Sequence, residues 1–105
     1  LKAVELEPGR GYIRDSLGWV YYKKGMYDKA LVEIQKSTEL EKDDPLMLEH
    51  LGDVYIKLDN KDAAIKAWEK SLEFHQKGEG LKERIEEKLE NVKEGGRMWA
   101  ARREL

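Results

Sequence analysis

Apolar residues recur along this chain at the spacing of an amphipathic α-helix, and the pattern is repeated after 34 residues. Each copy has apolar side chains at i, i+4, i+7 and i+8, so that they share one helical face. The two stripes are Ile13, Leu17, Val20 and Tyr21, and then Met47, Leu51, Val54 and Tyr55. We therefore predict a first helix in each of two repeated units.

A second amphipathic helix follows the first in each unit. We predict it over residues 27–41 and 61–77, where apolar residues again recur at helical spacing. The positions expected to face inward are Ala30, Ile34 and Leu40 in the first unit and Ala64, Trp68 and Phe74 in the second. Each unit is therefore predicted to be a helical hairpin, and the fold class is all-α.

Turn and cap residues stand at the predicted helix ends. Gly25 follows the first helix of one unit and Asp59-Asn60 follows its copy, and these residue types readily adopt the left-handed conformation that ends a helix. Asp44 precedes Pro45, and an Asp side chain can accept hydrogen bonds from the free amides of a helix that begins with Pro. These signals delimit the hairpins.

The recurring residues resemble the pattern of the tetratricopeptide repeat family, whose unit is a hairpin of 34 residues. The matching positions are Leu17, Gly18, Tyr21, Ala30, Ile34 and Ser37 in the first unit and Leu48, Leu51, Gly52, Tyr55, Ala64, Trp68 and Ser71 in the second. Arg14 stands where the family usually has Trp, and Lys42 and Gln76 stand where it usually has Pro. The resemblance implies two full repeats, residues 11–44 and 45–78, stacked as a solenoid.

Small residues in this pattern are expected to allow close approach of the two helices of a hairpin. Gly18 and Gly52 are expected to lie opposite Ala30 and Ala64, where a larger side chain would wedge the hairpin open. Trp68 is expected to be part of the core.

The repeat period extends past both complete units. Residues 1–10 carry Ala3, Leu6 and Pro8 in register with the end of a repeat, and we interpret them as the end of a truncated upstream repeat. Residues 79–94 are interpreted as a capping helix, because its apolar residues occupy a first-helix register and the rest of its surface is charged. These apolar residues are Leu81, Ile85, Leu89 and Val92.

The last residues, 95–105, differ in composition from the chain before them. Gly95-Gly96 is expected to break the helix and act as a linker, and residues 97–105 form a basic and apolar tail with three Arg and no Lys. Whether this tail belongs to the domain or is foreign to it stays open. The chain as a whole resembles the C-terminal fragment of a longer, bacterial, tetratricopeptide repeat protein, on the similarity of residues 15–19 and 50–53 to such repeats.

Composition narrows the classes of function. Charged residues make up 40% of the 105 residues, yet the net charge is only -2, so neither nucleic acid nor an anionic membrane surface is the expected partner. There is no Cys, and His50 and His75 lie 25 residues apart without a third ligand, so we expect no catalytic residue, no metal site and no cofactor. No apolar run is long enough to insert into a membrane. The compartment stays open between the cytoplasm and, for an exported parent, the periplasm.

The resemblance implies a peptide-binding groove on the concave side, lined by the outward faces of the first helices. Applied position by position, this geometry predicts a groove lined by Tyr12, Asp15, Trp19, Tyr22, Lys23, Glu49, His50, Asp53, Ile56, Lys57, Glu83 and Glu87. Such a groove is aromatic at one end and acidic at the other. Trp19 is either an anchor for a partner or a residue that packs on upstream helices.

We expect this groove to bind an apolar peptide segment that carries Lys or Arg, so that the chain is a protein-protein interaction scaffold and not an enzyme. The groove lacks the cluster of Lys, Asn and Arg with which some family members hold a terminal carboxylate. Self-association is the alternative: a homodimer could form through the exposed apolar residues Tyr12, Ile13 and Leu17, or through docking of the tail in a groove. RNA binding through Trp99 and the neighbouring Arg residues is a remote alternative.

Overall fold

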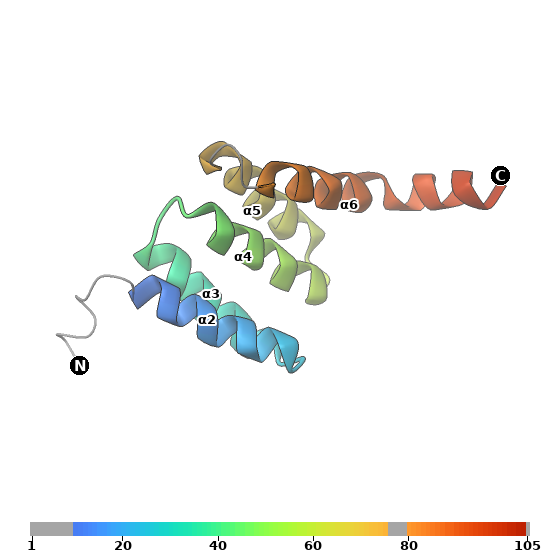
Figure 1. Cartoon of the computed structure of the whole chain (residues 1–105). Helices are drawn as coiled ribbons and strands as arrows, with labels where there is room; N and C mark the ends of the chain where they lie inside the picture. Colours follow the sequence, from blue (N-terminus) through green and yellow to red (C-terminus); the bar gives the residue numbers. More distant parts are fainter. Residues whose placement is uncertain (1–9, 76–79, 105) are drawn as a thin grey trace.

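The computed structural model describes the backbone of residues 10–75 and 80–104 and the side chains of residues 10–75 and 80–93. In these parts of the chain the backbone forms five α-helices and no strand (Figure 1). The helices are α2 (Arg10–Lys23), α3 (Tyr27–Leu40), α4 (Pro45–Lys57), α5 (Lys61–Phe74) and α6 (Leu81–Glu104). Helices α2 and α3 form one hairpin and α4 and α5 form the next, which confirms the all-α helical-hairpin repeat.

The hairpins stack because each first helix packs against the hairpin before it. Helix α4 packs on α3 and touches α2, and α6 packs on α5. Leu81, Ile85 and Leu89 of α6 are buried in one cluster with Ala64 and Trp68 of α5. Helix α6 therefore takes the place of a first helix in a third unit, as its apolar register predicts.

The predicted turns and caps are present at the helix ends. The Asp44 side chain accepts hydrogen bonds from the amides of Leu46 and Met47 at 3.0 and 3.1 Å, and Pro45 is the first residue of α4. Gly25 and Asp59 have φ values of 79° and 61°, in the left-handed region that ends a helix.

The inward positions of the second helices differ from the prediction at their C-terminal ends. Ala30, Ile34, Ala64 and Trp68 are buried as expected, but Leu40 and Phe74 are exposed, and Ser37 and Ser71 are fully buried instead. A residue six positions after the core residue is turned by about 120° from the core face, whereas one three positions after it stays near that face. The two serines satisfy their hydroxyls by donating to the carbonyl oxygens of Ile34 and Pro45.

The two recurring glycines lie against the second helix of their hairpin. A Cβ atom added at Gly18 would lie 3.2 Å from the carbonyl oxygen of Ala30, as expected, but the shortest contacts at both glycines are with larger side chains. A Cβ atom added at Gly18 would lie 2.5 Å from Cγ1 of Ile34, and one added at Gly52 would overlap the indole of Trp68. Gly52 therefore leaves room for the ring of Trp68, whose Nε1 donates to the carbonyl oxygen of Glu49 at 3.2 Å. The expected close approach is present, but the side chain that needs it is the bulky one of the second helix.

Helix α6 continues through Gly95 and Gly96 to Glu104, so the expected break at this pair is wrong. Each glycine costs about 1 kcal/mol in a helix interior, and the Glu, Arg, Met and Ala residues around the pair favour the helix. The last turns of α6 project past the other helices and away from α2 (Figure 1). The truncated repeat expected over residues 1–10 lies outside the described residues except for Arg10, as does Gln76.

One face of α2 is left without a neighbouring helix. Ile13, Leu17 and Val20 are 62%, 41% and 48% exposed, although their pattern predicts a buried stripe. Among the described residues no helix packs on this side, and the buried positions of α2 are Gly11, Asp15 and Gly18, which face α3 and α4. The apolar stripe is therefore a surface of the described chain.

Candidate functional site

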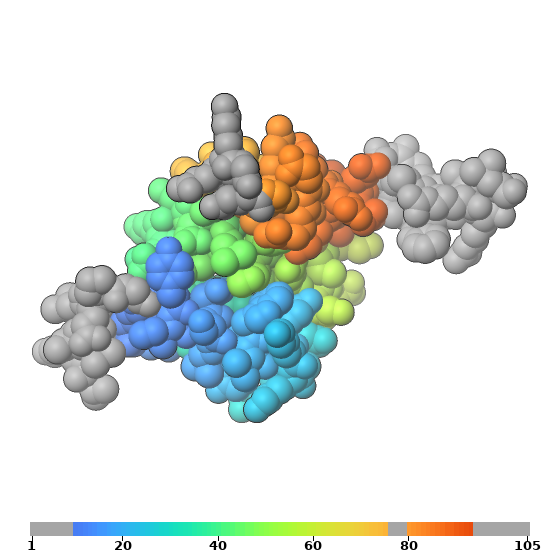
Figure 2. All heavy atoms as spheres, in the orientation of Figure 1, coloured from blue at the N-terminus to red at the C-terminus, as the bar shows by residue number. Residues whose placement is uncertain are grey.

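The first helices α2, α4 and α6 share one face of the molecule, and α4 lies between the other two (Figure 2). We call this surface the first-helix face. All the predicted groove residues come from these helices, but they fall into different surroundings. Tyr12 is exposed at the edge and donates to Asp44 at 2.8 Å, while Ile56 packs against the core cluster that holds Trp68. The exposed charged members are Lys23, Lys57, Glu83 and Glu87.

Aromatic rings form a stack on this face. The rings of Trp19 and Tyr22 are nearly parallel, with centroids 4.4 Å apart and an interplanar angle of 5°. The imidazole of His50 in α4 also stacks on Trp19, with centroids 4.2 Å apart, and Tyr27 meets Tyr22 edge-on at 5.6 Å. The structure therefore places Trp19 against α4, and the indole of Trp19 remains partly exposed.

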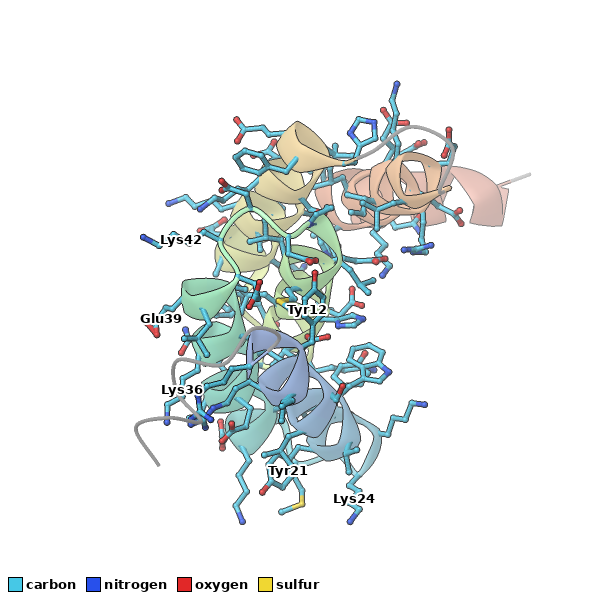
Figure 3. The ribbon with its side chains drawn as sticks, turned by 60° about the vertical axis from the view of Figure 1, so that its left-hand side comes forward. Tyr12, Tyr21, Lys24, Lys36, Glu39 and Lys42 are labelled. Atoms are coloured by element: carbon cyan, nitrogen blue, oxygen red, sulfur yellow. The ribbon has the colours of Figure 1, made fainter. Side chains whose placement is uncertain are left out.

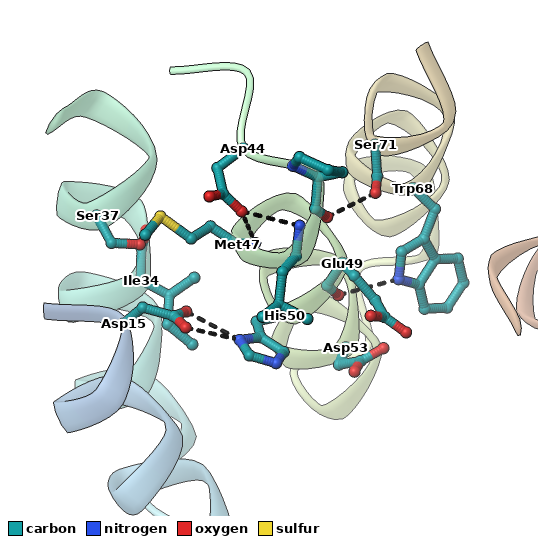
Figure 4. A network of polar contacts seen from close by, with 12 residues as sticks. Asp15, Ile34, Ser37, Asp44, Met47, Glu49, His50, Asp53, Trp68 and Ser71 are labelled. Carbon is teal, nitrogen blue, oxygen red and sulfur yellow. Dashed lines mark hydrogen bonds and ion pairs between the residues drawn. The ribbon is translucent and has the colours of Figure 1, made fainter. Parts of the chain in front are cut away.

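Acidic and basic side chains pair between successive units at a constant sequence separation of 35 residues. The three pairs are Asp15 with His50 at 2.9 Å, Glu49 with Arg84 at 2.6 Å, and Asp53 with Lys88 at 2.9 Å. Lys88 also donates to Glu49 at 2.7 Å, so that one ammonium joins both carboxylates of α4. Figure 4 shows Asp15 facing His50, and Glu49 and Asp53 side by side on α4. We call these three pairs the inter-repeat ladder.

The geometry of the ladder follows from the repeat itself. In each pair the basic residue lies 35 residues after the acidic one, which is the repeat period of 34 residues plus one. The two residues therefore occupy adjacent positions of the repeat, in successive units. A hairpin that stacks on the previous one with the same rotation repeats the same contact, and the pairs of Asp15 with His50 and of Glu49 with Arg84 are two such copies. The pair of Asp53 with Lys88 is specific to the second step, because Trp19 and Val54 stand at the equivalent positions one unit earlier. The ladder therefore joins α2 to α4 and α4 to α6.

Burial makes these charges interact strongly. The side chains of Glu49 and Asp53 are only 3% and 13% exposed. Burial by itself would raise the pKa of Glu49, but the hydrogen bonds and charges of Arg84 and Lys88 outweigh it and hold this pKa below its ordinary value. Burial dominates at Asp53, whose pKa is raised despite the hydrogen bond from Lys88.

Lys88 and Tyr22 respond to the same carboxylates. Burial would lower the pKa of Lys88, but its hydrogen bonds to Glu49 and Asp53 and their charges raise it, so the ammonium stays charged. Burial, followed by the charge of Asp53, raises the pKa of Tyr22. The aromatic stack and the ladder are thus one continuous site.

This arrangement corrects the expected acidic end of the groove. Asp15, Glu49 and Asp53 do not present free carboxylates, because each is paired with a base of the following unit. Asp15 and Glu49 are buried, and the Asp53 side chain is only 13% exposed. Arg84 and Lys88 are the partners that complete the site. Arg84 belongs to the expected cap end of the groove, whereas Lys88 is absent from the prediction, and neither is expected to pair with a carboxylate of α4. The acid-to-base offset of 35 residues is the sequence signal that could have found them.

Outside the first-helix face, the candidates for chemistry are the second histidine, His75, and any cluster of side chains that could bind a metal ion. Nδ1 of His75 donates to the carbonyl oxygen of Leu72 at 2.6 Å, far along the chain from the pair of His50 with Asp15. No cluster of three or more His, Asp or Glu within the described residues could hold a metal ion. None of the five helices combines the length and apolar character that crossing a bilayer requires.

Comparison with known proteins identifies the family. The model of the tetratricopeptide repeat-like domain matches residues 11–94, which span both hairpins and the packed part of α6. No curated protein sequence matches the chain. Domains of this family typically are non-catalytic scaffolds that mediate protein-protein interactions. With the matched region covering most of the chain and the stacked hairpins in place, this protein belongs to the tetratricopeptide repeat-like family.

Proposed function

We propose that the first-helix face binds a segment of a partner protein that carries apolar side chains and a Lys or Arg. The observation that carries this proposal is the partly exposed stack of Trp19, Tyr22 and Tyr27. Aromatic rings held by their neighbours lose little conformational entropy when a partner covers them, and such rings supply much of the energy at protein interfaces. The apolar side chains of the segment would lie on this stack.

Charge favours one orientation of the segment. Glu83 and Glu87 are exposed on α6, whereas Lys23 and Lys57 are exposed at the C-terminal ends of α2 and α4. Arg84 and Lys88 offset two of the three carboxylate charges of the ladder, so the exposed residues set most of the charge that a partner meets. A basic side chain of the segment would therefore lie near α6.

A selection of short random peptides displayed on phage tests the proposal. The baits are the natural chain, Glu87→Lys, and Glu86→Lys as a matched control on the same helix, since Glu86 is exposed but lies outside the predicted groove. We expect the natural chain and the control to select apolar peptides with Lys or Arg, and Glu87→Lys to lose them. Equal selection by all three baits, or acidic peptides from the natural chain, would exclude the proposed face.

Trp19→Ala provides a second arm of this test. Peptides selected by the natural chain should bind Trp19→Ala more weakly by at least about 1 kcal/mol, the loss typical of an interface residue that matters. The far-UV circular dichroism of Trp19→Ala shows whether its helices are intact. Undiminished binding by the folded variant would remove the aromatic stack from the proposal.

Self-association is a second candidate function, favoured by the exposed stripe of Ile13, Leu17 and Val20. In Figure 3, Tyr21 of α2 lies at the end of the molecule away from α6. Within the part of the chain that the structure describes, no helix packs on the exposed stripe of α2. Sedimentation velocity at several concentrations should show a dimer that Leu17→Gln converts to a monomer. A natural chain that stays monomeric at millimolar concentration would exclude this candidate.

A further inference from the structure

A separate hollow lies between the second helices α3 and α5, with α4 as its floor. It encloses about 560 Å³ and is open to solvent on its outer side. The floor consists of Leu48, Leu51 and Tyr55, and Ala63 and Ala67 form the apolar part of the α5 wall. None of the residues of the first-helix face lines it. We call this hollow the second-helix groove.

Small side chains and one hydrogen bond keep this groove open. The short side chains of Ala63 and Ala67 do not cover the α4 residues at the base of the groove, so these residues are accessible from solvent. On the other side, Nε2 of Gln35 in α3 donates to the hydroxyl of Tyr55 at 2.9 Å, which holds this ring at the floor. The groove is therefore a built feature of the stacked hairpins, with an apolar base that a partner could cover.

The rim of the groove is basic along α5. Lys66 and Lys70 follow one another by one helical turn on this wall, and Lys42 lies on the α3 side together with Glu39 and Asp43. Figure 3 shows Glu39 and Lys42 on the same side of the molecule. Among the side chains that the structure describes, no acidic group lies within ion-pair distance of these three lysines.

We infer that the second-helix groove is a docking site for an amphipathic helical segment of a partner protein that carries leucine-type side chains and Asp or Glu. The apolar face of such a helix would cover Leu51, Tyr55 and Ala67, as in other complexes where a helix lies in a groove. Its carboxylates would lie over the α5 wall, where Lys66 and Lys70 offer two charges at helical spacing. The acidic residues Glu39 and Asp43 at the opposite rim disfavour a fully acidic ligand and orient the segment.

This surface differs from the first-helix face in the charge that it prefers. The proposed partner of the first-helix face is basic, whereas the groove between α3 and α5 is lined by three lysines and two acidic residues and is basic along α5. The two surfaces could therefore bind two different partner segments at once. The failure of one proposal leaves the other intact, because different variants test them.

Titration with synthetic peptides tests the inference. The probes are two amphipathic helices of about five turns that share the same Leu positions and carry either Glu or Lys elsewhere. ¹H–¹⁵N correlation spectra of the natural chain should show shifts at the amides of Leu51, Ala63 and Ala67 with the Glu probe. The Lys probe should leave these amides unchanged.

Variants localise the effect. The double variant Lys66→Glu/Lys70→Glu should bind the Glu probe with an affinity at least about tenfold lower than the natural chain, because like charges then face each other across the contact. Lys24→Glu/Lys82→Glu, which reverses two exposed lysines outside the groove, is the matched control and should keep the affinity of the natural chain. Ala63→Leu should block the groove by filling it, and its circular dichroism shows whether the helices persist.

Three results with the peptide probes would overturn the inference, and a fourth comes from a polyanion control. One is the absence of shifts at the groove amides with the Glu probe at millimolar concentration. Another is equal binding of the Glu and Lys probes, and the third is mapping of the Glu probe to the first-helix face. Single-stranded poly(U) serves as a further arm: if it binds at these lysines more tightly than the Glu probe, the groove binds a polyanion and the peptide assignment is wrong.

Discussion

Replacing Lys88 by Met would test whether the inter-repeat ladder holds α6 on α4. Met keeps the unbranched apolar stem and removes the ammonium, which lies 2.7 Å from a carboxylate oxygen of Glu49 and 2.9 Å from one of Asp53. The variant leaves Glu49 with Arg84 but leaves Asp53 without its cation. The loss therefore falls mainly on Asp53, whose side chain is 13% exposed.

The expected loss of stability can be bracketed from the burial of the three groups. Breaking a fully buried pair costs about 3–5 kcal/mol, whereas an exposed pair contributes about 0.2–1 kcal/mol. The side chain of Lys88 is 29% exposed while those of Glu49 and Asp53 are 3% and 13% exposed, which places this site between the limits. We expect Lys88→Met to lower the free energy of unfolding by about 1–2.5 kcal/mol.

Urea unfolding followed by far-UV circular dichroism at neutral pH measures this change. The matched control is Lys93→Met on the same helix, because the pair of Lys93 with Glu69 is 3.0 Å long but 46% and 53% exposed. It should change the free energy of unfolding by less than about 0.5 kcal/mol. Adding Asp53→Asn to Lys88→Met should restore part of the loss, since it removes the unpaired charge.

Two results would refute this reasoning. Equal losses for Lys88→Met and Lys93→Met would show that burial does not strengthen the ladder. A double-mutant cycle between Lys88 and Asp53 with a coupling below about 0.5 kcal/mol would show that the two side chains do not interact energetically despite their distance.

Other predictions concern the core, a cap and acid pH. Gly52→Ala should destabilise the fold by about 1–3 kcal/mol, because its methyl group would overlap the indole of Trp68, and a melting temperature at or above that of the natural chain would contradict this. Asp44→Ala removes two hydrogen bonds to the first amides of α4 and should cost about 1 kcal/mol in urea unfolding, most of which Asp44→Ser should restore. The lowered pKa of Glu49 means that its contribution to stability is present above the ordinary value of 4.5 and is lost as the pH falls below it, whereas the raised pKa of Asp53 acts in the opposite direction. The free energy of unfolding of Glu49→Gln should therefore fall less steeply than that of the natural chain below pH 4.5, and identical slopes would rule out this role for Glu49.

Several elements of the fold could be predicted because they depend on neighbours in the sequence. The cap at Asp44 and the left-handed residues Gly25 and Asp59 act on backbone groups a few residues away, so the sequence contains both partners. The same holds for the apolar stripes of the helices, with two exceptions. Leu40 and Phe74 are exposed because the helical rotation excludes the assumed face, and Ile13, Leu17 and Val20 of α2 are exposed because no described helix packs on them.

The candidate site could be predicted only in part. The repeat period placed Asp15, Trp19 and His50 on the first helices, but it did not reveal that Asp15 pairs with His50 or that Trp19 stacks on it. These contacts depend on how far each hairpin turns relative to the one before it, and that rotation is set by packing between hairpins.

The sequence by itself determined that this chain is a series of helical hairpins and which faces of the helices are apolar. It did not determine every helix end, because α5 ends at Phe74 and α6 continues through Gly95 and Gly96. Only the tertiary structure decided that the carboxylates of α4 are covered by Arg84 and Lys88, and that a second groove opens between α3 and α5. The physical reason is that local rules act through the backbone within a few residues. The charge that a partner meets depends instead on groups 35 residues apart, which come within hydrogen-bond distance only after the hairpins have stacked.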